Sequence, residues 1–139
     1  MWEPHAIQVT SINHLKMYIE SNPKFGSQSP EQTFSLKVAK TNFNPEDASI
    51  GVKISVTIGL SEEGERLDDA EFWMEVIIEG IFKVNLEKFP LEKIDIWAEQ
   101  NAPMILYPYA RETAFSLTNR ICKEGAGLLP LLHVPTIKI

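Results

Sequence analysis

The chain has 139 residues, 44% hydrophobic and 23% charged, a balance typical of a folded globular domain rather than a disordered segment. Acidic residues outnumber basic ones by 19 to 13, and the net charge of −6 opposes binding to nucleic acid and to anionic membranes. Cys122 is the single cysteine, which excludes an intrachain disulfide, a CxxC redox pair and a cysteine zinc cluster.

The N-terminus has no basic segment followed by an apolar one, as a signal peptide would require. No stretch approaches the roughly 18 uninterrupted apolar residues of a membrane-spanning helix. We therefore expect a cytoplasmic protein with no direct membrane insertion.

The N-terminal region predicts an irregular strand. Ile7 and Val9 share one face near its start, and Leu15, Met17 and Ile19 share a face nearer its end. Polar Ser11 and Asn13 lie between the two halves, and a bulge or a bend would reconcile them.

Three more strands follow, because apolar and polar residues alternate over residues 34–38, 52–60 and 72–78. Residues 44–47 predict a compact turn, and residues 62–69 predict a charged hairpin loop. Short links join antiparallel neighbours, so we expect a four-stranded antiparallel meander.

The last third of the chain changes to helical spacing. Leu91, Ile94, Trp97 and Ala98 predict a first helix. Strands followed by helices indicate the α+β class, with the helices packed on one face of the sheet.

In the second predicted helix, Asn101 would be the N-cap and Pro103 would lie in the first turn. Pro108 removes one backbone hydrogen bond and predicts a kink. The apolar stripe of this helix consists of Leu106, Ala110, Ala114, Leu117 and Ile121. Glycines at 125 and 127 would end it.

No residue pattern predicts catalysis. His5, His14 and His133 are scattered without metal-ligand spacing, and no glycine-rich phosphate loop occurs. Cys122 could be paired with His133 as a nucleophile, but its apolar surroundings favour a small buried side chain. The carboxylates of residues 62–69 suit a solvated loop. We expect no enzyme activity, no metal and no cofactor.

Residues 101–112, Asn-Ala-Pro-Met-Ile-Leu-Tyr-Pro-Tyr-Ala-Arg-Glu, resemble the signature of the export chaperone family SecB, x-Pro-x-(Ile/Leu)-Leu-(Phe/Tyr)-Pro-Tyr-Ala-Arg-Glu. The residues that carry this signature are Pro103, Leu106, Tyr107, Pro108, Tyr109, Ala110, Arg111 and Glu112. Residues 75–82 and 129–135 also resemble the family, so the similarity covers most of residues 5–135.

The resemblance implies one SecB-like domain over residues 1–139. It implies a four-stranded antiparallel sheet with helices on one side, and dimers that pair into tetramers through the long helices. It also implies a holding chaperone that uses no ATP, binds unfolded or precursor polypeptides in apolar grooves and delivers them to the SecA motor. Arg111 and Glu112 are interpreted as structural residues.

The candidate client-binding residues are apolar side chains that a groove could expose, and each of them also fits a place in the core. They are Phe25, Phe34, Leu36, Val38, Leu128, Leu129, Leu131 and Leu132.

A second candidate surface is the wet face of the 72–78 strand, where Trp73, Glu75 and Ile77 would dock a basic partner. The resemblance implies that acidic residues on the first and fourth strands contact SecA, and Glu20 and Glu75 match such positions. Lys16 stands where the family has a second first-strand acid, which reverses the charge there.

Typical members continue into a second helix and an acidic tail, whereas this sequence ends at Ile139. We therefore expect a short member whose groove is shallower, more exposed or completed by another protein.

Three functional hypotheses remain open. The first is a general SecB-like chaperone. The second is a dedicated chaperone of one client, such as the antitoxin of a toxin–antitoxin pair, which neighbouring genes would reveal. The third is an interaction or regulatory module that has the fold but does not suppress aggregation.

Overall fold

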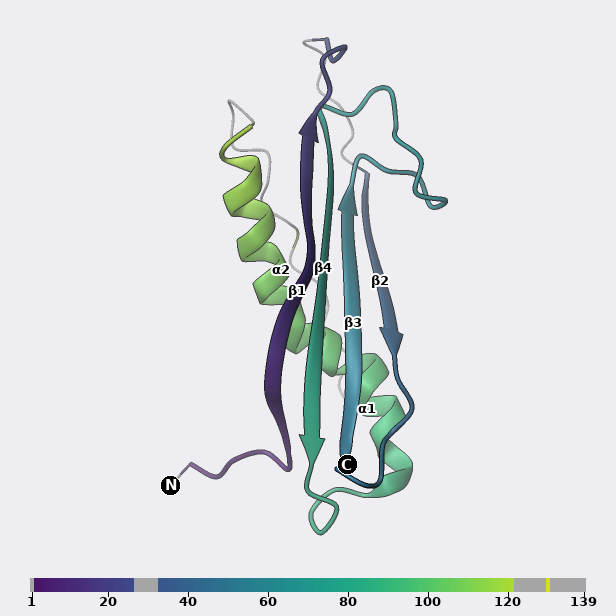
Figure 1. The fold of residues 1–139 in the computed structure, drawn as a ribbon, viewed down its shortest axis with the longest axis vertical. Helices are drawn as coiled ribbons and strands as arrows, with labels where there is room; N and C mark the ends of the chain where they lie inside the picture. Colours follow the sequence, from purple (N-terminus) through teal and green to yellow (C-terminus); the bar gives the residue numbers. More distant parts are fainter. Residues whose placement is uncertain (1, 27–32, 122–129, 131–139) are drawn as a thin grey trace.

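The computed structural model describes residues 2–26, 33–121 and 130 (Figure 1). Its elements are β1 (Ile7–Ser21), β2 (Phe34–Lys40), β3 (Ser49–Ile58), β4 (Phe72–Val84), a 3₁₀ turn (Leu91–Lys93), α1 (Ile94–Gln100) and α2 (Ala102–Thr118). The four strands form one layer, and both helices lie on the same side of it. This arrangement confirms the α+β class.

The sheet is antiparallel throughout, with the strand order β1-β4-β3-β2. The predicted meander is therefore correct for β2, β3 and β4 but wrong for β1, which pairs with β4 at the far edge. The link between β3 and β4 (residues 59–71) is as long as the link between β1 and β2 (residues 22–33), so loop length alone does not set this order. β3 and β4 remain neighbours through a hairpin that is closed by a bridge between Leu60 and Arg66, whereas β1 and β2 lie at opposite edges of the sheet. The result is a Greek-key order.

The predicted bulge in β1 is confirmed. The register against β4 shifts twice, between Val9 and Ser11 and again between His14 and Lys16. These shifts place Met17 opposite Val76, on the side of the sheet that faces the helices.

We call the side covered by α1 and α2 the inner face and the opposite side the outer face. The inner face holds the core, because the alternating aliphatic residues of β3 and β4 all point there. Its fully buried members include Ile54, Val56, Met74, Val76 and Ile78.

Helix α2 contributes small residues to this core. Leu106, Ala110 and Ala114 are fully buried, and Leu117 and Ile121 pack partly buried against them, as the apolar stripe predicts. The helix approaches closely because β4 has a glycine beneath it. A Cβ atom at Gly80 would lie 2.6 Å from Cδ2 of Leu106.

Two details of the helices differ from the sequence prediction. Asn101 makes no side-chain cap, because α1 runs directly into α2 and leaves Asn101 in a helical conformation. Leu91 is 60% exposed in the 3₁₀ turn, while Ile94 and Trp97 are buried as predicted. Helix α2 continues through Pro108 and bends along its length (Figure 1).

Candidate binding surfaces

Strand β2 presents a row of apolar side chains at one edge of the sheet. Phe34, Leu36 and Val38 lie opposite inner-face residues of β3 and therefore share the inner face. Phe34 and Leu36 are half-buried, whereas Val38 is exposed. The centroids of the Phe34 and Tyr107 rings are 6.4 Å apart. Leu36 packs against the core, and Val38 is 41% exposed.

This row combines features of the core and of a binding groove. Its buried end stabilises the fold, and its exposed end offers apolar surface beside the outer edge of β2. Within the described residues β2 has β3 as its only neighbour, so the other edge of its backbone is unpaired. An extended polypeptide can contact such an edge through both side chains and backbone.

The other candidate client-binding residues are not joined to this row. Phe25 is half-buried in the loop after β1, where its N–H donates to the carbonyl oxygen of Asn22. Leu128, Leu129, Leu131 and Leu132 lie outside the described residues.

Exposed apolar side chains on α2 and on β1 were not predicted from the sequence. Tyr109 and Phe115 on α2 are 43% and 46% exposed, and Met17 on β1 is 60% exposed. A hydrogen bond of 2.9 Å between His14 and Thr113 links the same two elements. The sequence analysis placed Met17 on an apolar face of β1, and the position of β1 at the edge of the sheet leaves this residue exposed.

The first tyrosine of the signature, Tyr107, contacts Pro130, which follows α2 in the chain. The Tyr107 hydroxyl donates to the carbonyl oxygen of Pro130 over 2.6 Å. Burial raises the pKa of Tyr107 above 10.0, and the positive charge of Arg111 partly lowers it. These contacts agree with a structural interpretation of the signature.

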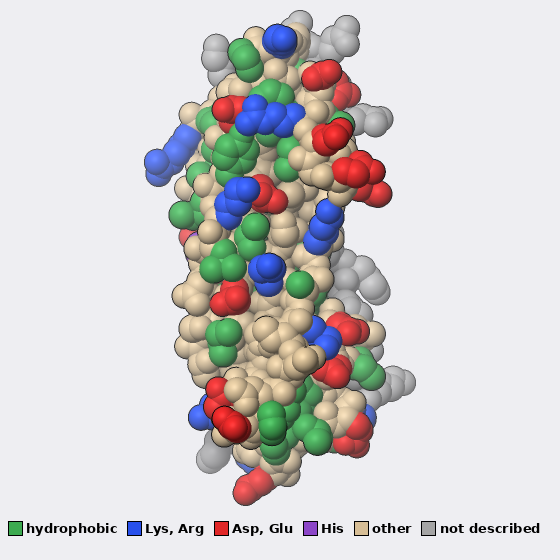
Figure 2. All heavy atoms as spheres, turned by 45° about the vertical axis from the view of Figure 1, so that its right-hand side comes forward, with side chains coloured by type: hydrophobic (Ala, Val, Ile, Leu, Met, Phe, Trp, Pro, Cys, Tyr) green, Lys and Arg blue, Asp and Glu red, His purple; other side chains and the backbone are tan. Residues whose placement is uncertain are grey.

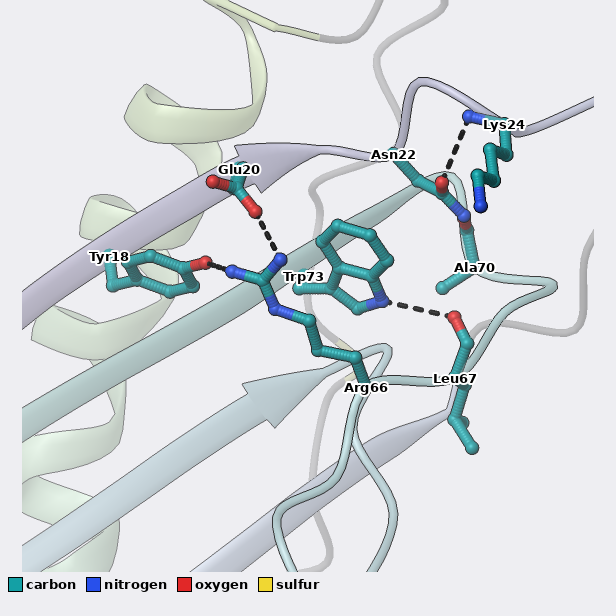
Figure 3. A network of polar contacts seen from close by, with 8 residues as sticks. All are labelled: Tyr18, Glu20, Asn22, Lys24, Arg66, Leu67, Ala70 and Trp73. Carbon is teal, nitrogen blue, oxygen red and sulfur yellow. Dashed lines mark hydrogen bonds and ion pairs between the residues drawn. The ribbon is translucent and has the colours of Figure 1, made fainter.

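The outer face differs from the sequence prediction at Trp73. This residue is 8% exposed, because the guanidinium of Arg66 lies 4.3 Å from the centroid of its ring (Figure 3). Arg66 also forms an ion pair with Glu20 and donates a hydrogen bond to the Tyr18 hydroxyl. The prediction failed because the loop that directly precedes β4 folds back over the strand.

The second predicted docking acid is also paired. Glu75 forms an ion pair with Lys16, which lies diagonally across the β1–β4 ladder. Both candidate acids, Glu20 and Glu75, therefore have cationic partners within the chain. Ile77, the next outer-face residue of β4 after Glu75, is half-buried.

Charge on this side of the molecule is mixed rather than uniformly acidic. Figure 2 shows basic side chains along the whole length of the visible face, between acidic and hydrophobic ones. Carboxylates gather instead on the exposed loop at residues 62–69.

Over residues 2–26, 33–121 and 130, no three His, Cys, Asp or Glu side chains converge as metal ligands would. The described helices include none that is long and apolar enough to cross a membrane.

Comparison with known proteins identifies the family. The family model described as preprotein translocase subunit SecB matches residues 6–131. A protein-export protein SecB of Neisseria meningitidis serogroup A is 28% identical over 130 residues, which cover 94% of this chain and 82% of that protein. The SecB of Methylobacillus flagellatus is also 28% identical, over 94% of this chain and 76% of its own length.

Two solved structures share the fold. A SecB-like chaperone of Mycobacterium tuberculosis, solved in complex with a ChAD peptide from an antitoxin, superposes with a TM-score of 0.66 at 20% identity. The match covers 96% of this chain and 94% of that one. A Streptococcus agalactiae protein of unknown function matches 90% of this chain and 97% of its own, with a TM-score of 0.51 at 12% identity. Because the family model spans nearly the whole sequence, this chain belongs to the SecB family.

Proposed function

We propose that this chain is an ATP-independent holding chaperone that binds unfolded or precursor polypeptides and performs no reaction on them. One observation carries the proposal. A row of apolar residues on an edge strand of a SecB-family fold runs from half-buried Phe34 and Leu36 to exposed Val38.

The energetics of holding an extended chain favour such a surface. Ordering a client costs about 1–2 kcal/mol of backbone entropy per residue. Burial of roughly 1,000 Å² of apolar area returns about 25 kcal/mol gross. Because this attraction has no fixed direction, it tolerates many client sequences. The proposed client-binding set is Phe25, Phe34, Leu36, Val38, Leu128, Leu129, Leu131 and Leu132.

We also propose that copies of the chain assemble as a dimer of dimers. Exposed apolar side chains beside α2, including Met17, Tyr109 and Phe115, support this proposal, because a second copy would remove them from water. Light scattering of the purified protein should give the mass of a tetramer, and a stable monomer would contradict the assembly.

Transfer of the client to SecA, in the cytoplasm, is the remaining part of the proposal. Glu20, Trp73, Glu75 and Ile77 would form the docking surface. Because Glu20 and Glu75 are ion-paired within the chain, we expect weaker docking than for a family member whose acids are free.

A second candidate function is a chaperone dedicated to one client, such as an antitoxin. The Mycobacterium tuberculosis chaperone that shares the fold was solved with an antitoxin peptide, which motivates this alternative. A toxin and antitoxin encoded beside this gene, together with binding of that antitoxin, would support it.

The decisive experiment mixes the protein with a refolding, aggregation-prone substrate and follows light scattering without nucleotide. We expect suppression near stoichiometric protein. Val38→Glu should raise the protein concentration needed for half-maximal suppression about tenfold, because it removes a binding contact of the size of one buried aliphatic side chain.

The matched control is Ala39→Glu, which adds the same charge to the neighbouring exposed residue on the outer face. It should leave suppression unchanged. Equal effects of the two substitutions would contradict the proposed row. No suppression by the unmodified protein with several substrates would overturn the general chaperone and leave the dedicated chaperone or the interaction module without holding activity.

A further inference from the structure

The guanidinium of Arg66 is held on the outer face by three different kinds of contact (Figure 3). It lies over the indole of Trp73, forms an ion pair with Glu20 and donates to the hydroxyl of Tyr18. Its partners come from two neighbouring strands, β1 and β4, whereas Arg66 belongs to the loop that joins β3 to β4.

This set of contacts is selective for arginine. A planar guanidinium can stack on an aromatic face while its N–H groups donate, in the plane of the guanidinium, to two different acceptors. The compact ammonium of lysine cannot do both at once. Tyr18, Glu20 and Trp73 therefore form a site with the chemistry of an arginine receptor.

The walls of this site are positioned independently of Arg66. Glu20 and Trp73 are direct partners in the β1–β4 ladder. The Trp73 indole N–H donates to the carbonyl oxygen of Leu67 over 3.0 Å. The Asn22 side chain donates to the carbonyl oxygen of Ala70 over 2.7 Å, so the loop stays attached to the end of β1. Removing the Arg66 side chain should therefore leave the site assembled.

Arg66 itself is held less firmly. Its side chain is 48% exposed and its ionic partner Glu20 is 49% exposed, so water competes for both. An open cavity of about 820 Å³ adjoins the site, and its charged lining residues are Glu20, Asp68, Lys24 and Arg66 itself. An incoming cationic side chain therefore has an entry with two carboxylates along it, opposed by the single charge of Lys24 once Arg66 is displaced.

We propose that Tyr18, Glu20 and Trp73 form a docking site for an arginine side chain of a partner polypeptide, and that Arg66 occupies this site as an internal ligand until the partner displaces it. The proposal deepens the docking part of the proposed function, and it rests on that part for the expectation of a basic partner. The apparent affinity for the partner is then the intrinsic affinity multiplied by the fraction of molecules in which Arg66 leaves the site free.

The test removes the internal ligand. An acetylated and amidated Gly-Gly-Arg-Gly-Gly peptide is titrated into the full chain and into Arg66→Gln. Binding is followed by the indole NMR signal of Trp73, assigned by its loss in Trp73→Phe. We expect Arg66→Gln to bind about tenfold more tightly, which would correspond to a site that Arg66 leaves free in roughly a tenth of unmodified molecules. A peptide with neutral citrulline in place of arginine should not bind.

Two further variants make the result specific. Lys53→Gln removes a positive charge from an exposed position elsewhere on the outer face and should not change the affinity. The double variant Arg66→Gln/Glu20→Gln should lose the gained affinity. Arg66→Lys should bind with intermediate affinity, and it keeps the charge if the glutamine variant does not fold.

Equal affinity of Arg66→Gln and the unmodified chain, or equal binding of the citrulline peptide, would overturn the proposal. Suppression of aggregation by Arg66→Gln should equal that of the unmodified chain, because Arg66 lies outside the client-binding set. If Arg66→Gln does not bind the arginine peptide but still suppresses aggregation normally, only the arginine site is refuted. Absence of suppression with normal peptide binding would refute only the holding function.

Discussion

The two faces of the sheet are built by different physical interactions, although β4 contributes to both. On the inner face, aliphatic residues of β3 and β4 pack against the leucine and alanines of α2. On the outer face, the same strand presents Trp73 and Glu75, which are held by Arg66 and Lys16. Alternation along one strand thus separates a packed core from a surface of polar contacts.

The difference indicates where stability and recognition reside. A fully buried aliphatic side chain contributes about 1.5–3 kcal/mol. An exposed ion pair contributes about 0.2–1 kcal/mol. The outer face can therefore change its charges at little cost to folding, while the inner face cannot change its volumes.

The largest expected effect tests the inner face. Leu106→Ala should lower the free energy of unfolding by about 2–5 kcal/mol, because it leaves a cavity between α2 and β4. Urea unfolding would measure it. Leu86→Ala, a leucine that is 45% exposed, is the matched control and should stay within about 0.5 kcal/mol. A similar loss in both would show that burial on this face does not determine stability.

An intermediate effect concerns Tyr107, whose pKa burial raises above 10.0. Above that pH the unfolded chain releases the phenolic proton while the folded chain retains it, so stability falls as pH rises. Tyr107→Phe should cost about 0.5–1.5 kcal/mol at pH 8 through the lost bond to Pro130, and less at pH 11. Unfolding of both proteins at the two pH values measures the difference.

Tyr109→Phe is the control for that experiment, since Tyr109 is exposed. It should change stability little at either pH. A cost of Tyr107→Phe that grows with pH would contradict the direction of the pKa shift.

The smallest expected effect tests the outer face. A double-mutant cycle with Lys16→Met and Glu75→Gln should give a coupling of about 0.2–1 kcal/mol that decreases in high salt. Thermal unfolding at two salt concentrations would measure it. A coupling of several kcal/mol, unaffected by salt, would mean that this face contributes to stability as the inner face does.

Much of the fold could be predicted from local pattern. The strands of 52–60 and 72–78 and the stripe of α2 lie where the periodicity places them, because each repeats a burial pattern over many residues. A bulge or bend in β1 was also predicted, since polar Ser11 and Asn13 interrupt its apolar residues, and the register against β4 shifts twice in this strand.

The candidate surfaces could be predicted less well. The row of Phe34, Leu36 and Val38 was expected as one face, but the exposure of Val38 beside half-buried Phe34 and Leu36 depends on how the helices cover the edge of the sheet, which no local pattern encodes. The burial of Trp73 could not be anticipated, because Arg66 lies in a loop whose direction no local pattern encodes.

The sequence alone determined which residues form strands and helices, because that choice rests on the period of apolar side chains within each segment. It also determined the family, through the twelve-residue stretch that opens the long helix. Only the tertiary structure decided that β1 lies beside β4 and that Arg66 covers Trp73. The first depends on pairing between strands far apart in the chain. The second depends on the path of the loop that directly precedes β4, which is held over Trp73 by contacts of Arg66 with Tyr18 and Glu20 of β1. Neither leaves a periodic mark on its own segment.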